Sequence, residues 1–463
     1  MKKRIAAIAA IAVVLAAGYA GATVWSGQKT EARHREYLDR FQAQAPFLKL
    51  TEQSYRKSFA SASSTSTFEI GCTTADGKAP PRLVLTETIR HGPFAGGTVA
   101  AAVIDARLGL TGPEGERLMA MFTGPPLSAH TVVDFAGKAT STVTGAAAKM
   151  ALPEGVELAW QGLSGIVEFG GDMRAFSYHL RSPGVTLVDT AKGLALRMSG
   201  LDLQATGRFL NGSGRLGTGK GRGGVDAMEM SMAVPAAAGA LANPVSVSLT
   251  GLEFTSDSSI SGELMSMTST LVGAAAVNGT KFDRLEMRGS MKNLHAPTYQ
   301  KILERFSTLP GCKTTTTEAT PAQLLGDLQA DVTTLARYSP EVALDKLTID
   351  HGGKRGEISY SLALVGVMAA DEPLPMLALL MSRGRVKASM RMPLAWVRQL
   401  SQEGSSRMQG AVPGPEVVDA MVDNAVAEGY LVRDGDDIRS SVDFTAGVMT
   451  INGKTLPGPG KKP

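Results

Sequence analysis

The sequence predicts a mainly β fold with α insertions (α+β), in which an extended, curved antiparallel sheet follows an N-terminal transmembrane helix. Two patterns support the sheet. From Ser54 to about Arg288, apolar and polar residues mostly alternate, which is the period of a strand with one buried face. Gly, Pro, Asn and Asp interrupt these runs roughly every 8–15 residues, as between successive hairpins. No apolar runs alternate with helices, so a parallel sheet is disfavoured.

The N-terminus predicts export across a bacterial-type inner membrane. Lys2, Lys3 and Arg4 precede 21 uncharged residues, Ile5 to Trp25. As a helix these span about 31 Å, the thickness of a hydrocarbon core. The cations stay in the cytoplasm, so residues 28–463 lie in the periplasm. Ala20-Gly21-Ala22 also fits a signal-peptide cleavage site, so a cleaved signal remains an alternative to a single-pass anchor.

Composition excludes some classes of protein. The net charge of the 463 residues is +4, and three of the cations precede the apolar segment, so the exported part is nearly neutral. With no basic block among aromatic residues, nucleic acid is not expected as a partner. Apolar residues make up 43%, too many for a disordered chain. Cys72 and Cys312 either form a disulfide, as an oxidising periplasm favours, or are two separate buried thiols.

Helices are expected at four places. The first, 28–45, has Tyr37, Leu38 and Phe41 on one stripe and ends at Pro46, and it is either a stalk or a docking helix. The second is Pro297 to Ser307. The others start at Thr320, which can cap Pro321 and its successors, and near Pro415, with an end at Gly429.

Strands resume after the helix that starts at Thr320. They are expected at 343–349, 357–365 and 385–392, followed by a terminal hairpin from Ile438 to Ile451. Asn452-Gly453 is a strong turn signal. The chain therefore divides into 1–27 (anchor or signal peptide), 28–50 (membrane-proximal helix), 51–296 (β-rich region), 297–340 (helical segment) and 341–463 (C-terminal β region with one helix).

No motif predicts an enzyme, a metal or a cofactor. Gly212 to Gly217 matches G-x-G-x-x-G, but the glycines from Gly221 to Gly224 do not start the helix that a phosphate loop requires. The six histidines are at least 39 residues apart, so no zinc spacing exists. His91 lies in a Gly-Pro turn, where a structural role is expected.

Methionines alternate at three places: Met228, Met230 and Met232; Met265 and Met267; Met390 and Met392. On a strand, each set lies on one face. Three interpretations are open: thioether ligands for Cu(I), an adaptable lining for an acyl chain, and ordinary sheet core.

Several local strings in order along the chain resemble the YdgA-like bacterial family of unknown function. They are Ser54-Tyr55-Arg56-Lys57-Ser58-Phe59 followed by Ser61, His91-Gly92-Pro93-Phe94, Arg284 to Phe306, Met390-Arg391-Met392-Pro393, Gly429-Tyr430-Leu431, and Gly447 to Asn452-Gly453. Ser58 departs from the glycine that this family usually has there. The resemblance implies an uncleaved inner-membrane anchor and a periplasmic body, and it supplies no catalytic residue. Tyr55, His91, Gly92, Pro93, Phe94, Asn452 and Gly453 are the motif residues to follow.

The function expected from these features is that of a non-enzymatic envelope protein that binds another envelope component. The alternative is a lipid-binding or lipid-transfer module with an apolar β groove. Expected partners are the inner membrane and either a lipid or another envelope protein, and a homo-oligomer is open. A continuous apolar surface open to solvent favours lipid handling, whereas a filled core counts against it.

Overall fold

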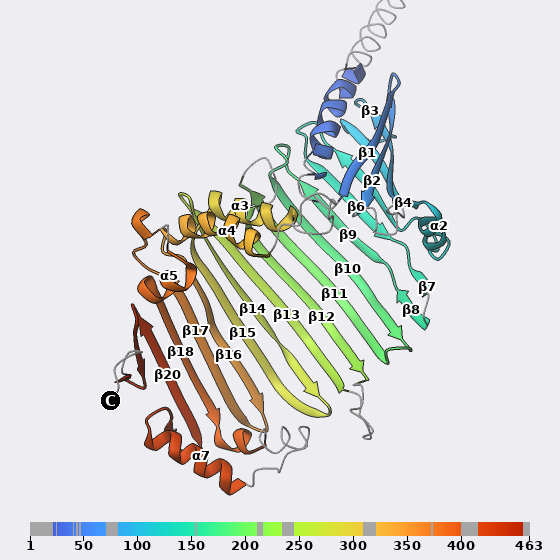
Figure 1. Cartoon of the computed structure of the whole chain (residues 1–463). Helices are drawn as coiled ribbons and strands as arrows, with labels where there is room; N and C mark the ends of the chain where they lie inside the picture. Colours follow the sequence, from blue (N-terminus) through green and yellow to red (C-terminus); the bar gives the residue numbers. More distant parts are fainter. Residues whose placement is uncertain are drawn as a thin grey trace, which may run out of the picture. The chain divides into compact units, whose positions relative to one another are not determined.

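The structure is a computed structural model that describes residues 22–24, 26–39, 41–42, 45, 48–70, 82–152, 155–210, 216–233, 245–308, 321–371, 374–399 and 415–456. It is mostly β, with long antiparallel strands (Figure 1). The chain divides into two compact units. The first comprises Met1–Pro244 with Glu304–Glu318, and the second comprises Val245–Leu303 with Ala319–Pro463.

The described residues of the first unit form an antiparallel sheet of twelve strands. They are β1 (Leu48–Lys57), β2 (Ser61–Ile70), β3 (Arg82–His91), β4 (Ala102–Thr111), β5 (Leu127–Val133), β6 (Ala139–Gly145), β7 (Ala148–Leu152), β8 (Val156–Trp160), β9 (Leu163–Phe169), β10 (Ala175–Asp189), β11 (Leu194–Phe209) and β12 (Gly217–Met232). Each pairs with the next from β1 to β6, and the order continues β6-β9-β10-β11-β12. The hairpin β7–β8 pairs with the second half of β10. Helix α2 (Pro113–Met119) connects β4 to β5.

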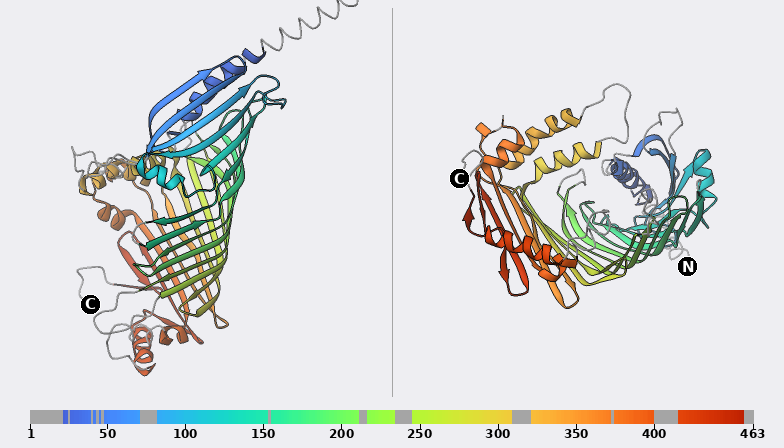
Figure 2. Two further views of the ribbon diagram at one scale, coloured as in Figure 1. Left: turned by 90° about the vertical axis from the view of Figure 1, so that its right-hand side faces the viewer. Right: turned by 60° about the horizontal axis from the view of Figure 1, so that its bottom comes forward.

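A helix packs on the first strands of this unit. Residues 22–24, 26–39 and 41–42 are helical and lie beside β1–β3 (Figure 2). Leu38 is buried in a cluster with Leu48 and Phe68, and the partly buried side chain of Phe41 packs against this cluster. The expected helix is therefore confirmed as a docking helix, although Tyr37 is 37% exposed and does not share the buried stripe. It also begins before residue 28, and β1 already starts at Leu48, which pairs with Ile70.

The second unit is an antiparallel sheet with helices in its connections. Its strands are β13 (Val245–Ser261), β14 (Leu264–Val277), β15 (Thr280–His295), β16 (Glu341–His351), β17 (Lys354–Leu364), β18 (Gly384–Pro393), β19 (Val432–Asp434), β20 (Asp437–Thr445), β21 (Val448–Ile451) and β22 (Lys454–Thr455). Strands β13 to β18 pair in sequence order, and β20 pairs with β18. Strands β19 and β21 then pair with β20, and β22 pairs with β21.

The expected helices of this unit are confirmed. Helices α3 (Ala296–Thr308) and α4 (Pro321–Ala336) connect β15 to β16 (Figure 1), and α7 (Pro415–Ala427) precedes β19. The sequence did not indicate the short helix α2, nor α5 (Met376–Arg383) and the 3-10 turn η2 (Ala369–Asp371) between β17 and β18. Both missed helices have no more than eight residues, too few to establish a helical period.

Some predictions fall on residues outside the described ranges. Cys72, Cys312 and most of the apolar segment Ile5 to Trp25 are among them, as are residues 211–215 of the glycine-rich string. No helix within the described ranges is both long and apolar enough to cross a bilayer. Gly221 to Gly224 belong to strand β12, so the interpretation that they start no phosphate-binding helix is confirmed.

Candidate functional site

Tyr55 and His91, the first two motif residues, lie on the sheet face that the N-terminal helix covers. Tyr55 on β1 is directly opposite Ser64 on β2, and Ser64 is opposite Glu87 on β3. Such opposed residues share a face, and His91, an even number of positions beyond Glu87, shares it too. The fold therefore brings polar side chains together between helix and sheet.

His34 of the helix and Glu87 form a buried pair at the centre of this polar cluster. His34 Nε2 lies 2.5 Å from Glu87 Oε2, and the two side chains are only 3% and 6% exposed. The Tyr55 ring lies 5.4 Å from the His34 ring, centroid to centroid. Burial, reinforced by the negative charges of Glu31 and Glu87, raises the pKa of Tyr55, so its hydroxyl stays protonated.

Many polar atoms of the cluster are unsatisfied. Within the described residues, His34 Nδ1, the Tyr55 hydroxyl and the hydroxyls of Ser64 and Ser66 are buried without a hydrogen-bond partner. A buried polar atom that lacks a partner costs about 1–3 kcal/mol. The contact between the helix and the sheet therefore includes buried polar groups that lower the stability of the fold. Apolar side chains at these positions would pack without that cost.

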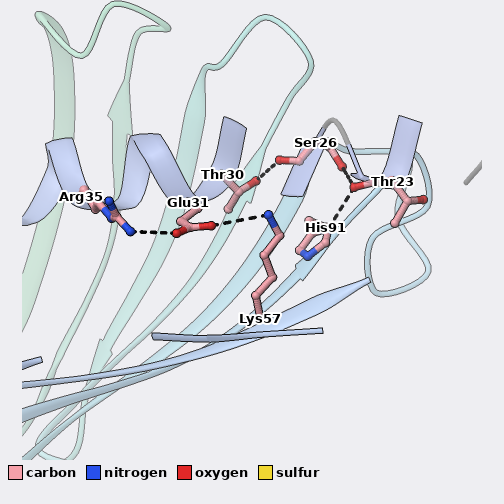
Figure 3. A network of polar contacts seen from close by, with 7 residues as sticks. All are labelled: Thr23, Ser26, Thr30, Glu31, Arg35, Lys57 and His91. Carbon is pink, nitrogen blue, oxygen red and sulfur yellow. Dashed lines mark hydrogen bonds and ion pairs between the residues drawn. The ribbon is translucent and has the colours of Figure 1, made fainter. Parts of the chain in front are cut away.

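His91 contacts the first turns of the helix (Figure 3). Its Nδ1 lies 3.3 Å from the carbonyl oxygen of Thr23, which also accepts a 3.0 Å hydrogen bond from the Ser26 hydroxyl. His91 is 2% exposed, and its Nε2 has no partner among the described residues. Burial lowers the pKa of His91, and the Lys57 ammonium lowers it further, against hydrogen bonds with the backbone of Thr23 and Ser61.

Two glycines allow this close approach. A Cβ on Gly27 would lie 2.5 Å from Cε1 of His91, so only glycine lets the helix backbone reach the ring. Gly92 has φ +121°, and a Cβ there would meet the Thr23 hydroxyl at 2.9 Å. Pro93 is half-buried, and Phe94 is 62% exposed in the turn that follows.

This cluster does not form an accessible catalytic constellation. His91 contacts a backbone carbonyl rather than a carboxylate, and the His34–Glu87 pair is buried. Among the described residues, no group of three or more His, Cys, Asp and Glu side chains can hold a metal ion.

Two rows of apolar side chains cross the sheet of the second unit. Directly opposed residues of neighbouring antiparallel strands share a face. The first row comprises Phe254, Leu271, Met287, Leu347, Ile358 and Met390, on β13 to β18. The second comprises Met267, Met291, Val342, Leu362, Val386, Phe444 and Met449, on β14 to β21. On each of β14, β15 and β17, the residue of the first row and the residue of the second row are an even number of positions apart. The two rows therefore lie on the same face of the sheet.

This apolar face is open to solvent in the described part of the unit. Phe254, Met287, Val342 and Leu362 are 44%, 40%, 43% and 37% exposed, respectively. The other face is charged: Lys346, for example, lies 3.3 Å from Glu286. With strands about 4.8 Å apart, the six strands of the first row span about 24 Å.

Methionines recur in such rows in the first unit as well. Met150, Leu158, Leu187, Leu196 and Met230 form one row across β7, β8, β10, β11 and β12. Met230 and Met232 are 36% and 46% exposed, whereas Met265 in the second unit is 2% exposed. The alternating methionines therefore include both core and open positions.

Two hollows in the second unit lie among polar groups. The smaller, of about 380 Å³, is lined by Lys354, Arg355, Glu357, Arg391, Asp436 and Asp437. Its cations pair with carboxylates, since Arg355 Nε lies 2.6 Å from Asp350 and Arg391 Nε lies 2.7 Å from Asp437. The larger hollow, of about 630 Å³, is lined mainly by polar residues of β16, β17, β18 and β20. Neither hollow has the chemistry of an apolar ligand site.

Asn452 and Gly453 form the turn between β21 and β22, as the sequence predicted. Both have positive φ, 51° and 81°, as a two-residue hairpin requires. Asn452 Oδ1 accepts a 2.8 Å hydrogen bond from the Ser441 backbone N–H, and Nδ2 donates one of 2.9 Å to the Gly429 carbonyl. This side chain ties the last hairpin to β20 and to the end of α7.

Asn452→Gly is expected to destabilise the second unit by about 1–3 kcal/mol, because it keeps the backbone conformation and removes these hydrogen bonds. Native-state hydrogen exchange of peptides from β18, β20 and β21 in the full-length chain measures the change. Ala446→Gly is the matched control, since Ala446 also has positive φ, 49°, but no polar side chain. The control is expected to be neutral or stabilising. Equal losses in both variants would contradict the role of Asn452.

Comparison with known proteins shows to which family this chain belongs. The family model described as "Bacterial protein of unknown function (DUF945)" matches residues 1–459. Searches of curated proteins and of solved structures gave no match. Since the family model covers almost the whole chain, this protein belongs to the DUF945 family of bacterial proteins of unknown function.

Proposed function

We propose that this protein is a non-enzymatic, lipid-handling protein of the bacterial envelope, which holds acyl chains on the apolar face of its sheet. The observation that carries this proposal is the pair of unbroken apolar rows across the second unit, whose large side chains remain open to solvent. An exposed apolar surface of this size marks a site for a lipid or a partner.

The chemistry of the face favours a lipid over a folded partner. Met267, Met287, Met291 and Met390 supply flexible thioethers, which adapt to irregular and mobile apolar ligands. The face consists of rows rather than one compact patch, and a span of about 24 Å suits an extended acyl chain. Protein interfaces, in contrast, usually surround an apolar centre with a polar rim.

The expected location fits this activity. The basic start and the apolar segment Ile5 to Trp25 favour a single-pass inner-membrane protein whose body lies in the periplasm, as the resemblance to YdgA-like proteins also implies. Such an anchor would keep the sheet beside a supply of lipid.

Leu362→Asp tests the proposal. A carboxylate in the middle of the second row is expected to weaken the binding of cis-parinaric acid, a fluorescent long-chain fatty acid, by about tenfold or more, because the charge must be desolvated against the chain. The full-length protein in detergent is titrated with the probe, and native mass spectrometry measures lipid that co-purifies.

Ser361→Asp is the matched control, because Ser361 is the neighbouring residue on the opposite face of β17. Its affinity for the probe should equal that of the wild type. The lipid proposal fails if the wild type neither binds the probe nor carries co-purified lipid, or if both variants lose affinity equally.

A further inference from the structure

The contact between the N-terminal helix and the sheet has two chemically different halves. At its C-terminal half, Leu38 and Phe41 pack on Leu48 and Phe68. At its N-terminal half, Thr23 and Gly27 lie against His91, and the Ser26 hydroxyl donates a hydrogen bond to the Thr23 carbonyl. The contact from Leu38 onward is apolar, whereas the contact of the first turns depends on a titratable ring.

The ring of His91 fits this place only when it is neutral. Nδ1 faces the Thr23 carbonyl, and the Ser61 backbone also favours the protonated ring, but Nε2 makes no hydrogen bond within the described residues. The helix backbone at Gly27 lies so close that a single Cβ there would overlap the ring. Protonation would therefore bury a positive charge and a second N–H that only backbone groups can compensate.

The surrounding charges do not compensate a cation at His91. From β1, Lys57 adds a second positive charge, and Tyr55 is a neutral hydroxyl. Glu31, a carboxylate of the helix, is shared between Lys57 at 3.5 Å and Arg35 at 2.9 Å (Figure 3). On β3, Glu87 is engaged by His34, and β2 contributes the hydroxyls of Ser64 and Ser66.

We infer that residues 22–24 and 26–31 form a pH-sensitive latch, which is docked on the sheet while His91 is neutral and released when His91 is protonated, while the Leu38 half remains anchored. The free ring titrates near pH 6.5. Because the docked ring resists protonation, the released state binds more protons below that pH. Docking is therefore complete above about pH 6.5 and weakens as the pH falls through it.

The magnitude follows from this linkage. A ring that titrates near 6.5 when free and whose pKa is lowered when docked reduces the docking equilibrium between pH 7.5 and pH 5.5 by up to about tenfold, the limit reached if the docked ring stays neutral throughout. Hydrogen–deuterium exchange of the full-length chain in detergent, corrected for the intrinsic rate at each pH, should show this loss of protection at 22–31. Protection at 38–42, where the contact is apolar, should change little.

His91→Asn tests the cause, because asparagine keeps a hydrogen-bonding group of similar size and is neutral at every pH. Its protection at 22–31 should be the same at both pH values. His130→Asn is the control: this histidine on β5 is 55% exposed and pairs with Asp105 at 2.7 Å, so the response should stay that of the wild type.

Lys57→Gln gives an independent test if His91→Asn fails to dock. Removing the nearby cation makes protonation of the docked ring less costly, so the loss of protection should become smaller than in the wild type. The latch is overturned if wild-type protection at 22–31 is equal at the two pH values, or if Lys57→Gln leaves the full response.

Discussion

Replacing His34 by alanine is expected to lower the free energy of unfolding of the first unit by about 3–5 kcal/mol, because it leaves the Glu87 carboxylate buried without its partner. Glu87 is only 6% exposed, and its hydrogen bond to His34 Nε2 is the contact that compensates its burial. Native-state hydrogen exchange of peptides from β1, β2 and β3 measures the loss.

A surface pair on the same strands provides the control. Arg82 lies 3.2 Å from Glu69 across β2 and β3, but the two side chains are 45% and 23% exposed. Arg82→Ala should cost no more than about 1 kcal/mol, because solvent screens an exposed pair. If His34→Ala costs as little as Arg82→Ala, the buried pair does not hold the helix.

The double variant His34→Leu with Glu87→Leu separates the cost of the broken pair from the value of the intact one. Replacing both members of a buried pair by apolar residues of similar size is often neutral or stabilising. We expect the double variant to recover most of the loss caused by His34→Ala. Failure to recover would show that the polar network around Tyr55 and Ser64, rather than the pair alone, stabilises this interface.

The period of the sequence predicted the strands, but not their registers. Alternation marks which residues share a face, as for Leu83, Leu85, Glu87, Ile89 and His91 on β3. Alternation does not show which strands pair with one another. Bulges, such as the one between Leu344 and Leu347, also shift the register without a signal in composition. The apolar rows across six strands became visible only when all these registers were known.

The candidate site was partly visible in the sequence. Tyr55 and His91 were singled out by resemblance alone, whereas His34 and Glu87 were missed because they lie far apart in the chain. A signal nevertheless existed in the patterns. His34 lies four residues before Leu38, on the buried stripe of its helix, and Glu87 occupies an apolar position of an alternating strand. Polar residues at two such positions in facing elements indicate a buried pair.

Phe68→Ala is expected to destabilise the first unit by about 3–5 kcal/mol, because the cavity it leaves in a fully buried site is only partly filled by relaxation. Phe68 is 0% exposed, and its ring packs edge-on against that of Phe41, with 5.4 Å between the ring centroids. Native-state hydrogen exchange at β2 and at residues 34–42 measures the effect. Phe59→Ala, at a phenylalanine that is 58% exposed, should cost well under about 1 kcal/mol.

This variant also separates the two halves of the helix contact. If Phe68 anchors the apolar half and His91 governs the polar half, Phe68→Ala should lower protection along the whole helix at pH 7.5. The ratio of protection at 22–31 between pH 7.5 and pH 5.5 should nevertheless remain that of the wild type, because that ratio depends on the His91 ring and the groups around it rather than on Phe68. A ratio near one in Phe68→Ala would mean that the ring titrates freely once the anchor is lost. In that case the apolar half, which positions the helix backbone against His91, would be a condition for the pH response.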